Sequence, residues 1–125
     1  MYTEFTVYGK PRGKGRPRFT KYGGVYTPKE TVEYEKLILT YFRESMKNYP
    51  FELALSDRPM CLSLMANFSS KKNPWELKPD VDNIAKVYMD ALSGHAYVDD
   101  KQIIKLEIGK MQGAVDSVYV KLEEL

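Results

Sequence analysis

Apolar and polar residues alternate with a period of two in four short stretches of the chain. The first stretch covers residues 3–8, and the others cover residues 60–68, 104–108 and 118–122. A period of two is typical of β-strands that bury one face, because successive side chains point to opposite sides of a sheet. The last two stretches lie on either side of a turn predicted at Gly113. The pattern therefore predicts a sheet of four or more strands.

A short hairpin is predicted between the first strand and the first helix. The stretch from Gly9 to Pro17 is too rich in glycine and proline to continue a central strand. Residues 18–20 and 25–27 then flank Lys21-Tyr22-Gly23-Gly24, which is typical of a hairpin closed by a glycine-bearing turn.

The first helix is predicted from Thr27 to about Met46, where apolar residues recur at spacings of two to four. Thr27 and Glu30 have the spacing of a capping box, in which each side chain bonds the backbone of the other residue. The asparagine and prolines that follow predict a loop, with a short ordered piece over residues 51–55.

The second helix is predicted to begin around Asp80 or Asp82 and to end near Ser93, where Gly94 supplies a C-terminal stop. Two helices and several strands in a chain of this length predict an α+β fold. We expect a single small domain over residues 1–125, with a mixed sheet of four or more strands and the two main helices packed on one face.

Composition excludes several classes of protein. The chain has 125 residues and a single cysteine, Cys61, so a disulfide scaffold is excluded, and no set of Cys and His has zinc-ligand spacing. The N-terminus has no basic segment leading into an apolar stretch, and no run approaches the roughly 18 apolar residues of a membrane span. We therefore expect a soluble, cytoplasmic protein without membrane association.

The charged residues form two blocks of opposite sign. Seven lysines and arginines and no acid lie between Gly9 and Lys29, whereas five aspartates are opposed by one lysine between Asp80 and Asp100. Soluble surfaces usually intersperse the two signs. The separation suggests that the first block holds a polyanion and that the second holds a metal ion.

The acidic block contains a candidate metal site. Asp80 and Asp82 straddle the point where a loop enters the second helix, and a turn after the helix would return Asp100 to the same end. Mg²⁺ takes oxygen ligands, usually a few carboxylates together with water and phosphate. Asp80, Asp82 and Asp100 would supply such a set, with Asp99 as the alternative to Asp100. Acids also cap helix starts and occupy solvated turns, which is the simpler alternative.

Lys86 lies one helical turn beyond Asp82 on the same side of the helix. Phosphodiester hydrolysis requires an activated water and cations against the developing negative charge, which Mg²⁺ provides. Lys86 would neutralise charge on the scissile phosphate or orient the water. An ordinary surface ion pair is the alternative. His95, the only histidine, is not assigned a catalytic role, because a lone loop histidine is more often structural.

The basic block has a regular spacing. Every second position carries a positive charge, at Lys10, Arg12, Lys14, Arg16 and Arg18. In an extended chain these side chains would project to one side, and the intervening glycines and prolines would let the backbone approach phosphate. Such contacts bind DNA with a strong salt dependence and without reading its sequence. A disordered basic arm is the alternative.

Two further groups of residues are candidates for contact with nucleic acid. Lys71, Lys72 and Trp75 lie in the loop before the second helix. Phe19, Tyr22 and Tyr26 belong to the predicted hairpin, where they would either stack on unpaired or distorted bases or pack against one another.

Several short motifs follow one another along the chain. They are Gly9-Lys10-Pro11, Lys14-Gly15-Arg16-Pro17-Arg18, Tyr26-Thr27-Pro28, Lys78-Pro79-Asp80-Val81-Asp82-Asn83 with Lys86, Asp90-Ala91-Leu92, and Asp99-Asp100 with Gln102. Because they occur together and span nearly the whole chain, their combination is specific. In these motifs the chain resembles the RusA family of Holliday junction resolvases.

The resemblance implies a RusA-like fold and a Mg²⁺-dependent homodimeric endonuclease, with Mn²⁺ as a substitute ion. Such enzymes cut four-way DNA junctions in paired fashion during recombination and repair. By the match of motifs, Asp80, Asp82 and Asp100 are implied to be the essential acids and Lys86 the essential lysine. A phage or prophage origin is also implied. A dimer suits this chemistry, because two symmetric strands must be cut.

Two other functions remain compatible with the same residues. In the first, the protein is a non-catalytic DNA-binding module, whose basic segment binds phosphate while the acids only cap helices and interact with solvent. In the second, which the residues support less well, it is a structural or regulatory protein that self-associates through its separated charges.

Overall fold

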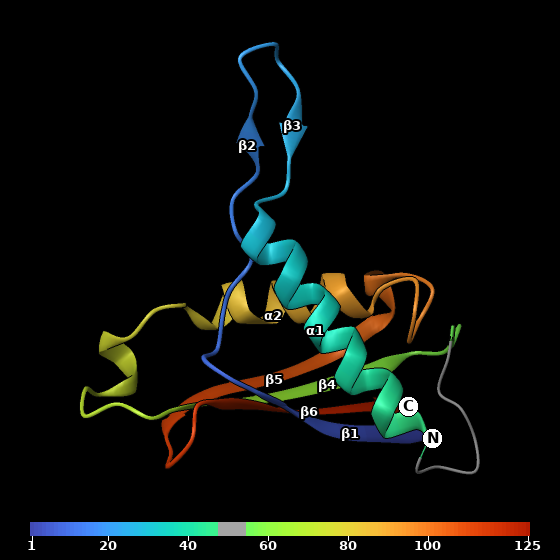
Figure 1. Cartoon of the computed structure of the whole chain (residues 1–125). Coiled ribbons are helices and arrows are strands. Elements are labelled where there is room, and N and C mark those ends of the chain that lie inside the picture. The colour runs from blue at the N-terminus through green and yellow to red at the C-terminus, as the bar shows by residue number, and fades with distance from the viewer. Residues whose placement is uncertain (48–54) are drawn as a thin grey trace.

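The computed structural model describes residues 1–47 and 55–125, and it shows one mixed sheet with two helices on one face (Figure 1). The predicted ordered piece over residues 51–55 falls almost wholly outside the described residues. The elements in chain order are β1 (Tyr2–Tyr8), β2 (Arg18–Phe19), β3 (Val25–Tyr26), α1 (Lys29–Met46), β4 (Met60–Phe68), η1 (Pro74–Glu76), α2 (Val81–Leu92), η2 (Asp100–Gln102), β5 (Ile103–Gln112) and β6 (Ser117–Glu124). The predicted α+β class is confirmed.

The main sheet has the strand order β1-β6-β4-β5. β4 runs parallel to β5, and the other neighbouring strands are antiparallel. Because side chains alternate between the two faces of a strand, each central strand turns one row of apolar residues toward the helices. Val120 of β6, for example, lies between Phe5 of β1 and Leu64 of β4, and all three side chains are buried. Burial of such side chains from water is the main force that joins the strands.

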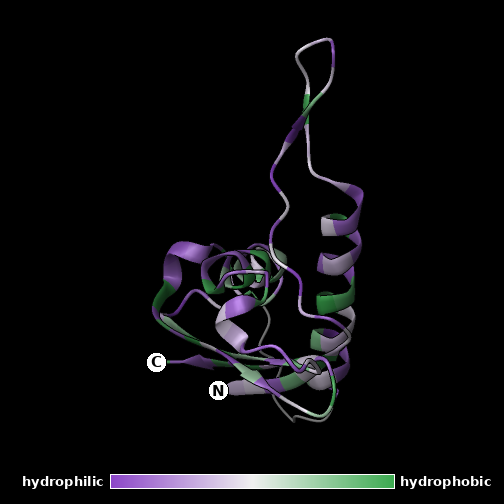
Figure 2. Ribbon diagram, turned by 90° about the vertical axis from the view of Figure 1, so that its left-hand side faces the viewer, coloured by the Kyte–Doolittle hydropathy of each residue, from purple (hydrophilic) through white to green (hydrophobic). Residues whose placement is uncertain are grey.

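Helices α1 and α2 cover this apolar face of the sheet (Figures 1 and 2). Ile38 of α1 and Ile84 of α2 are completely buried in the common core. The hydroxyl groups of Tyr34 and Tyr88 lie 2.8 Å apart and hydrogen bond to each other between the two helices. A buried hydroxyl needs such a partner, so this pair fixes where the helices meet.

The two strands that flank Gly113 are not neighbours in the sheet. β5 and β6 follow each other in the sequence, but β4 lies between them and pairs with both. The amide of Gly113 donates to the carbonyl of Phe68, the last residue of β4, at 3.0 Å. The connection therefore crosses the end of β4, and β5 is left at the edge of the sheet.

The predicted capping box at the start of α1 is wrong. Pro28 occupies the N-cap position without a side-chain hydrogen bond, and the helix begins at Lys29. Pro28 has an extended backbone conformation, so Thr27 stands one residue too early to cap the helix. The hydroxyl of Thr31 instead accepts a hydrogen bond from the amide of Gly15 at 3.0 Å. A segment distant from the helix in sequence thus holds its first turn.

Candidate functional site

The acidic residues at the start of α2 do not act as helix caps. Asp80 is the N-cap residue by position, and its carbonyl accepts the amide of Ile84 at 3.1 Å, but its side chain forms no capping hydrogen bond. Asp82 follows in the first turn. The simpler interpretation of Asp80 as a side-chain cap is therefore not supported, and its carboxylate remains available for another role.

An open hollow beside α2, which we call the acidic hollow, brings together most of the predicted catalytic residues. It measures about 220 Å³ and is lined by Asp82, Ala85, Lys86, Met89, Asp90, Asp100 and Leu106. Positions 82, 86 and 90 share one face of α2, because residues four apart are neighbours on a helix. Asp100 reaches the hollow from η2. Asp80 is not among the lining residues.

The structure separates the roles of the adjacent Asp99 and Asp100. Asp99 is the N-cap of η2: its carboxylate accepts the amide of Lys101 at 3.3 Å, and its own amide donates to Oε1 of Gln102 at 2.8 Å. Asp100 lines the acidic hollow together with Asp82. The geometry therefore favours Asp100 as the acid that faces the helix.

A buried tyrosine lies close to the aspartates of the acidic hollow. The hydroxyl of Tyr97 donates to the carbonyl of Met89 at 2.6 Å. Burial raises the pKa of Tyr97, and the nearby charges of Asp100, Asp90 and Asp99 raise it further. Tyr97 consequently stays protonated under the aspartates and adds no charge of its own.

The acidic hollow has the chemistry of a hard-cation site, although its side chains do not enclose an ion. Among residues 1–47 and 55–125, no three Asp, Glu, His or Cys side chains are grouped closely enough to hold a metal ion together. Mg²⁺ is usually bound through one or two carboxylates, with water and substrate phosphate completing its octahedron. Asp82 and Asp100 fit that requirement, since both are carboxylates and both line the acidic hollow.

Asp90 joins two lysines at the floor of the site. Its Oδ2 atom lies 3.2 Å from Nζ of Lys14 and 3.9 Å from Nζ of Lys86. The side chain of Lys14 is only 19% exposed and also contacts Oε1 of Glu35 at 2.7 Å. Partial burial lowers the pKa of Lys14, but the hydrogen bonds to Glu35 and Asp90 outweigh it and raise the pKa overall. The side chain of Lys86, by contrast, is 62% exposed and can reach a ligand in solution.

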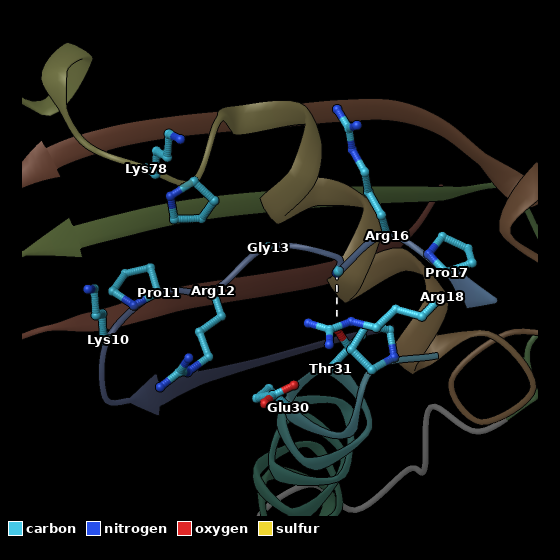
Figure 3. A pocket seen from close by; sticks show the side chains of 13 residues that line it. Lys10, Pro11, Arg12, Gly13, Arg16, Pro17, Arg18, Glu30, Thr31 and Lys78 are labelled. Carbon is cyan, nitrogen blue, oxygen red and sulfur yellow. Dashed lines mark hydrogen bonds between the residues drawn. The ribbon is translucent and has the colours of Figure 1, made fainter. Parts of the chain in front are cut away.

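A second and larger hollow is formed mainly by residues 10–18, which we call the basic segment. This basic hollow measures about 470 Å³. Its charged lining residues are Lys10, Arg12, Arg16, Arg18, Lys78 and Glu30 (Figure 3). Four of the five predicted cations of the segment thus share one surface, and only Glu30 opposes them.

Among the five cations of the basic segment, Lys14 does not line the basic hollow. Its amide donates to the carbonyl of Asn83 at 3.0 Å, and its side chain reaches Glu35 and Asp90. Side chains at every second residue project to the same side only where the backbone is regularly extended. Because its backbone is bound to α2, Lys14 turns inward, while Arg12 and Arg16 line the basic hollow.

Glycine allows the basic segment to lie against both helices. A Cβ atom on Gly13 would stand 2.8 Å from Cβ of Asn83 and 2.9 Å from Cβ of Pro79, and one on Gly15 would stand 2.5 Å from Oγ1 of Thr31. These distances are shorter than van der Waals contact. The glycines were expected to bring the backbone to phosphate; in the structure they bring it to the start of α1 and α2.

The remaining predicted residues lie outside both hollows. Lys71 and Lys72 are exposed in the loop before η1, where Nε2 of Gln112 donates to the carbonyls of Ser70 at 3.2 Å and of Lys72 at 2.8 Å. His95 lines a different hollow, which also contains Phe42.

Sequence reasoning missed two residues of the site. Lys78 lines the basic hollow, and its position next to Pro79-Asp80 was the signal available in the sequence. In the sequence Asp90 stood out only as part of the motif Asp90-Ala91-Leu92, but it lines the acidic hollow and binds Lys14. Local spacing could not have indicated that contact, because Lys14 lies far away along the chain.

The chain is similar to a known protein family and to a bacterial protein. The family model described as Endodeoxyribonuclease RusA matches residues 8–123. The protein named "Uncharacterized protein YqaN" of Bacillus subtilis (strain 168) is 31% identical to this chain over an alignment 137 residues long. The alignment covers 98% of this chain and 96% of that protein. The family match includes both hollows. None of the helices within residues 1–47 and 55–125 combines the length and the apolar character of a membrane span.

Proposed function

Because this chain belongs to the RusA endodeoxyribonuclease family, whose members are nucleases that resolve DNA junctions, we propose that it is a Mg²⁺-dependent endonuclease that cuts four-way DNA junctions in recombination and repair. The observation that carries the proposal is the attachment of the basic segment to the acidic helix. The amide of Lys14 donates to the carbonyl of Asn83 at 3.0 Å. A DNA strand bound by the basic segment would therefore lie beside α2 and its acids.

The basic hollow is the proposed site for the DNA backbone. Its cations Lys10, Arg12, Arg16, Arg18 and Lys78 would contact phosphate oxygens of one strand. Phosphate contacts fix the position of the nucleic acid and carry no sequence information. The basic hollow would therefore hold the DNA without reading its base sequence.

Asp82 and Asp100 are the proposed metal ligands, with Asp80 at the helix start as the third acid. When bound there, Mg²⁺ would lower the pKa of a bound water and offset negative charge on the reacting phosphate, and Mn²⁺ is proposed as a substitute. Lys86 would place its ammonium group against the developing charge of the transition state. Asp90 lies 3.9 Å from Lys86 and would limit the directions in which that side chain extends.

We also propose that the active form is a homodimer. Paired cutting of a junction requires two active sites related by twofold symmetry, and an isologous interface between two copies of one chain supplies that relation. We propose a cytoplasmic location for the enzyme, because its DNA substrate lies there.

The direct test is incubation of the purified protein with a synthetic four-way junction and with a linear duplex of the same sequence, each in Mg²⁺ and in EDTA. We expect symmetric nicks near the branch point in Mg²⁺, and binding without cutting in EDTA. An intact junction in Mg²⁺ would favour the non-catalytic DNA-binding module. Cutting that persists in EDTA would exclude the metal-dependent mechanism.

A further inference from the structure

The β2–β3 hairpin exposes large apolar side chains to solvent. Phe19 is 76% exposed, Tyr22 is 86% exposed and Val25 is 61% exposed. The hairpin projects away from the sheet and the helices (Figures 1 and 2), and within the described residues β2 and β3 form a two-stranded sheet of their own. Packing, one of the two roles open to these aromatic residues, therefore does not account for Phe19 and Tyr22.

The pairing of β2 with β3 determines which side chains lie on each face of the hairpin. Arg18 pairs with Tyr26, and Phe19 pairs with Val25. Directly paired residues share a face, so one face carries an aromatic and an aliphatic side chain and the other carries a cation beside an aromatic ring. A flat or apolar surface is thus available on both faces.

The turn holds a third aromatic residue at the tip. The amide of Thr20 donates to the carbonyl of Gly24 at 2.7 Å, and the amide of Gly24 donates to Oγ1 of Thr20 at 2.9 Å. Gly23 has a φ of +85°, which glycine adopts without strain. These contacts define the turn and place Tyr22 at its end, where Nζ of Lys21 lies 5.2 Å from the ring centroid.

Charge identifies the kind of partner that this surface fits. Every charged residue from Lys10 to Lys29 is basic, so an anionic partner is favoured. Arg18 belongs to β2 and also lines the basic hollow, so the exposed rings continue the surface proposed for phosphates. Aromatic rings beside a phosphate-binding groove are the arrangement that binds unpaired bases, since every base has a flat face.

We propose that the β2–β3 hairpin enters the branch point of a DNA junction, where Phe19 and Tyr22 stack on bases that have lost a stacking neighbour. Arg16 and Arg18 hold the phosphates next to those bases. This inference rests on the proposed function, because a branch point is where a junction offers unstacked bases. The hairpin would then supply preference for branched over linear DNA, which phosphate contacts alone do not.

Photochemical crosslinking tests the contact directly. 5-Iododeoxyuridine is placed either at the branch point of a four-way junction or in the middle of one arm, and each complex with the full-length protein is irradiated in EDTA. We expect the branch-point probe to crosslink to a peptide that contains Phe19 or Tyr22, and the arm probe to give little product there. Crosslinks from the branch point to a different segment would overturn the proposal.

Affinity measurements with matched variants test whether the hairpin gives a preference for branched over linear DNA. For Phe19→Leu combined with Tyr22→Leu we expect affinity for the junction to fall by about tenfold, since stacking contributes strongly for each base, and affinity for the linear duplex to change by less than about twofold because phosphate contacts remain. Phe19→Tyr combined with Tyr22→Phe keeps both rings and should bind as the wild type does. Circular dichroism checks that each variant is folded.

The outcomes separate this inference from the proposed function. If the wild type cuts junctions and the leucine variant retains its preference for them, the hairpin proposal is wrong and the proposed function stands. If the loss is equal for junction and duplex, the hairpin contributes general affinity only, which also contradicts the proposal. If the wild type neither prefers nor cuts junctions, the proposed function fails, and this inference fails with it.

Discussion

The Nζ atom of Lys14 lies 3.2 Å from Oδ2 of Asp90, so a residue of the basic segment is bound to the helix that carries the candidate catalytic acids. Gly13 and Gly15 permit this contact by letting the backbone on either side approach α2 and α1. The basic and acidic hollows are therefore held in a fixed relation, and several consequences can be measured.

Removal of the charge at Asp82 should separate cutting from binding. For Asp82→Asn we expect the rate of junction cutting to fall by about 100-fold or more, because several kcal/mol of charge stabilisation depends on the metal. Binding in EDTA should be unchanged or tighter, since a negative charge near phosphate is lost. Gel-shift and cleavage assays measure the two effects. Asp57→Asn, an exposed carboxylate outside both hollows, is the matched control. Equal loss of both activities would indicate misfolding instead.

Lys86 should act on the rate and not on metal binding. For Lys86→Ala we expect cutting to slow by about 100-fold to 1,000-fold, which is typical when one charge-stabilising group is removed. Affinity for Mg²⁺, measured by calorimetry, should be preserved. Lys36→Ala removes an exposed lysine from α1 and should have no effect. Normal turnover of the Lys86→Ala variant would reduce Lys86 to an ion-pair partner of Asp90.

Lys14 should contribute to the stability of the fold through its two ion pairs. Lys14→Met leaves Glu35 and Asp90 without their shared cation, and we expect the free energy of unfolding to fall by about 1–3 kcal/mol. Because the pKa of Lys14 is raised above its ordinary value of 10.5, its contribution should be constant below that pH and should be lost as the pH rises further. Urea unfolding of both proteins at several alkaline pH values measures this difference. An unchanged stability would contradict the role of Lys14 as the link between the hollows.

A methyl group at Gly15 should separate the basic segment from α1. For Gly15→Ala the added Cβ would stand 2.5 Å from Oγ1 of Thr31, and we expect a loss of about 1–3 kcal/mol in the free energy of unfolding. At Gly109 the added Cβ would meet only the end of the flexible Met65 side chain, so Gly109→Ala should be tolerated. Thermal and denaturant unfolding compare the two. Similar stability for both variants would show that the close contact is not required.

The salt dependence of binding should identify the cations that contact phosphate. In a plot of log affinity against log salt concentration, Arg12→Ala combined with Arg16→Ala should reduce the slope by about two, because each phosphate contact contributes about 0.9. Lys71→Ala combined with Lys72→Ala tests the predicted contact that lies outside the basic hollow. An equal reduction for the lysine pair would extend the interface to that loop. No reduction for the arginine pair would remove the basic hollow from the interface.

Much of the fold could be predicted from the sequence, because its signals are local. The period-two alternation located the strands, glycine marked the hairpin turn and the end of α2, and apolar spacing located both helices. The start of α1 was predicted one or two residues early, because Pro28 has a non-helical backbone conformation and the helix begins only at Lys29. The position of β4 between β5 and β6 could not be predicted from the sequence either, because strand order depends on contacts between distant segments.

For the site, the sequence by itself determined which chemical groups are present: a block of cations, a block of carboxylates with Lys86 among them, and the order of motifs that the RusA family shares. Only the tertiary structure decided how those groups meet. It places Asp100 and not Asp99 in the hollow with Asp82, turns Lys14 away from the other cations, and adds Lys78 and Asp90. The physical reason is that spacing along a chain fixes side-chain direction only within one regular element, whereas the direction across elements depends on which backbones pack together.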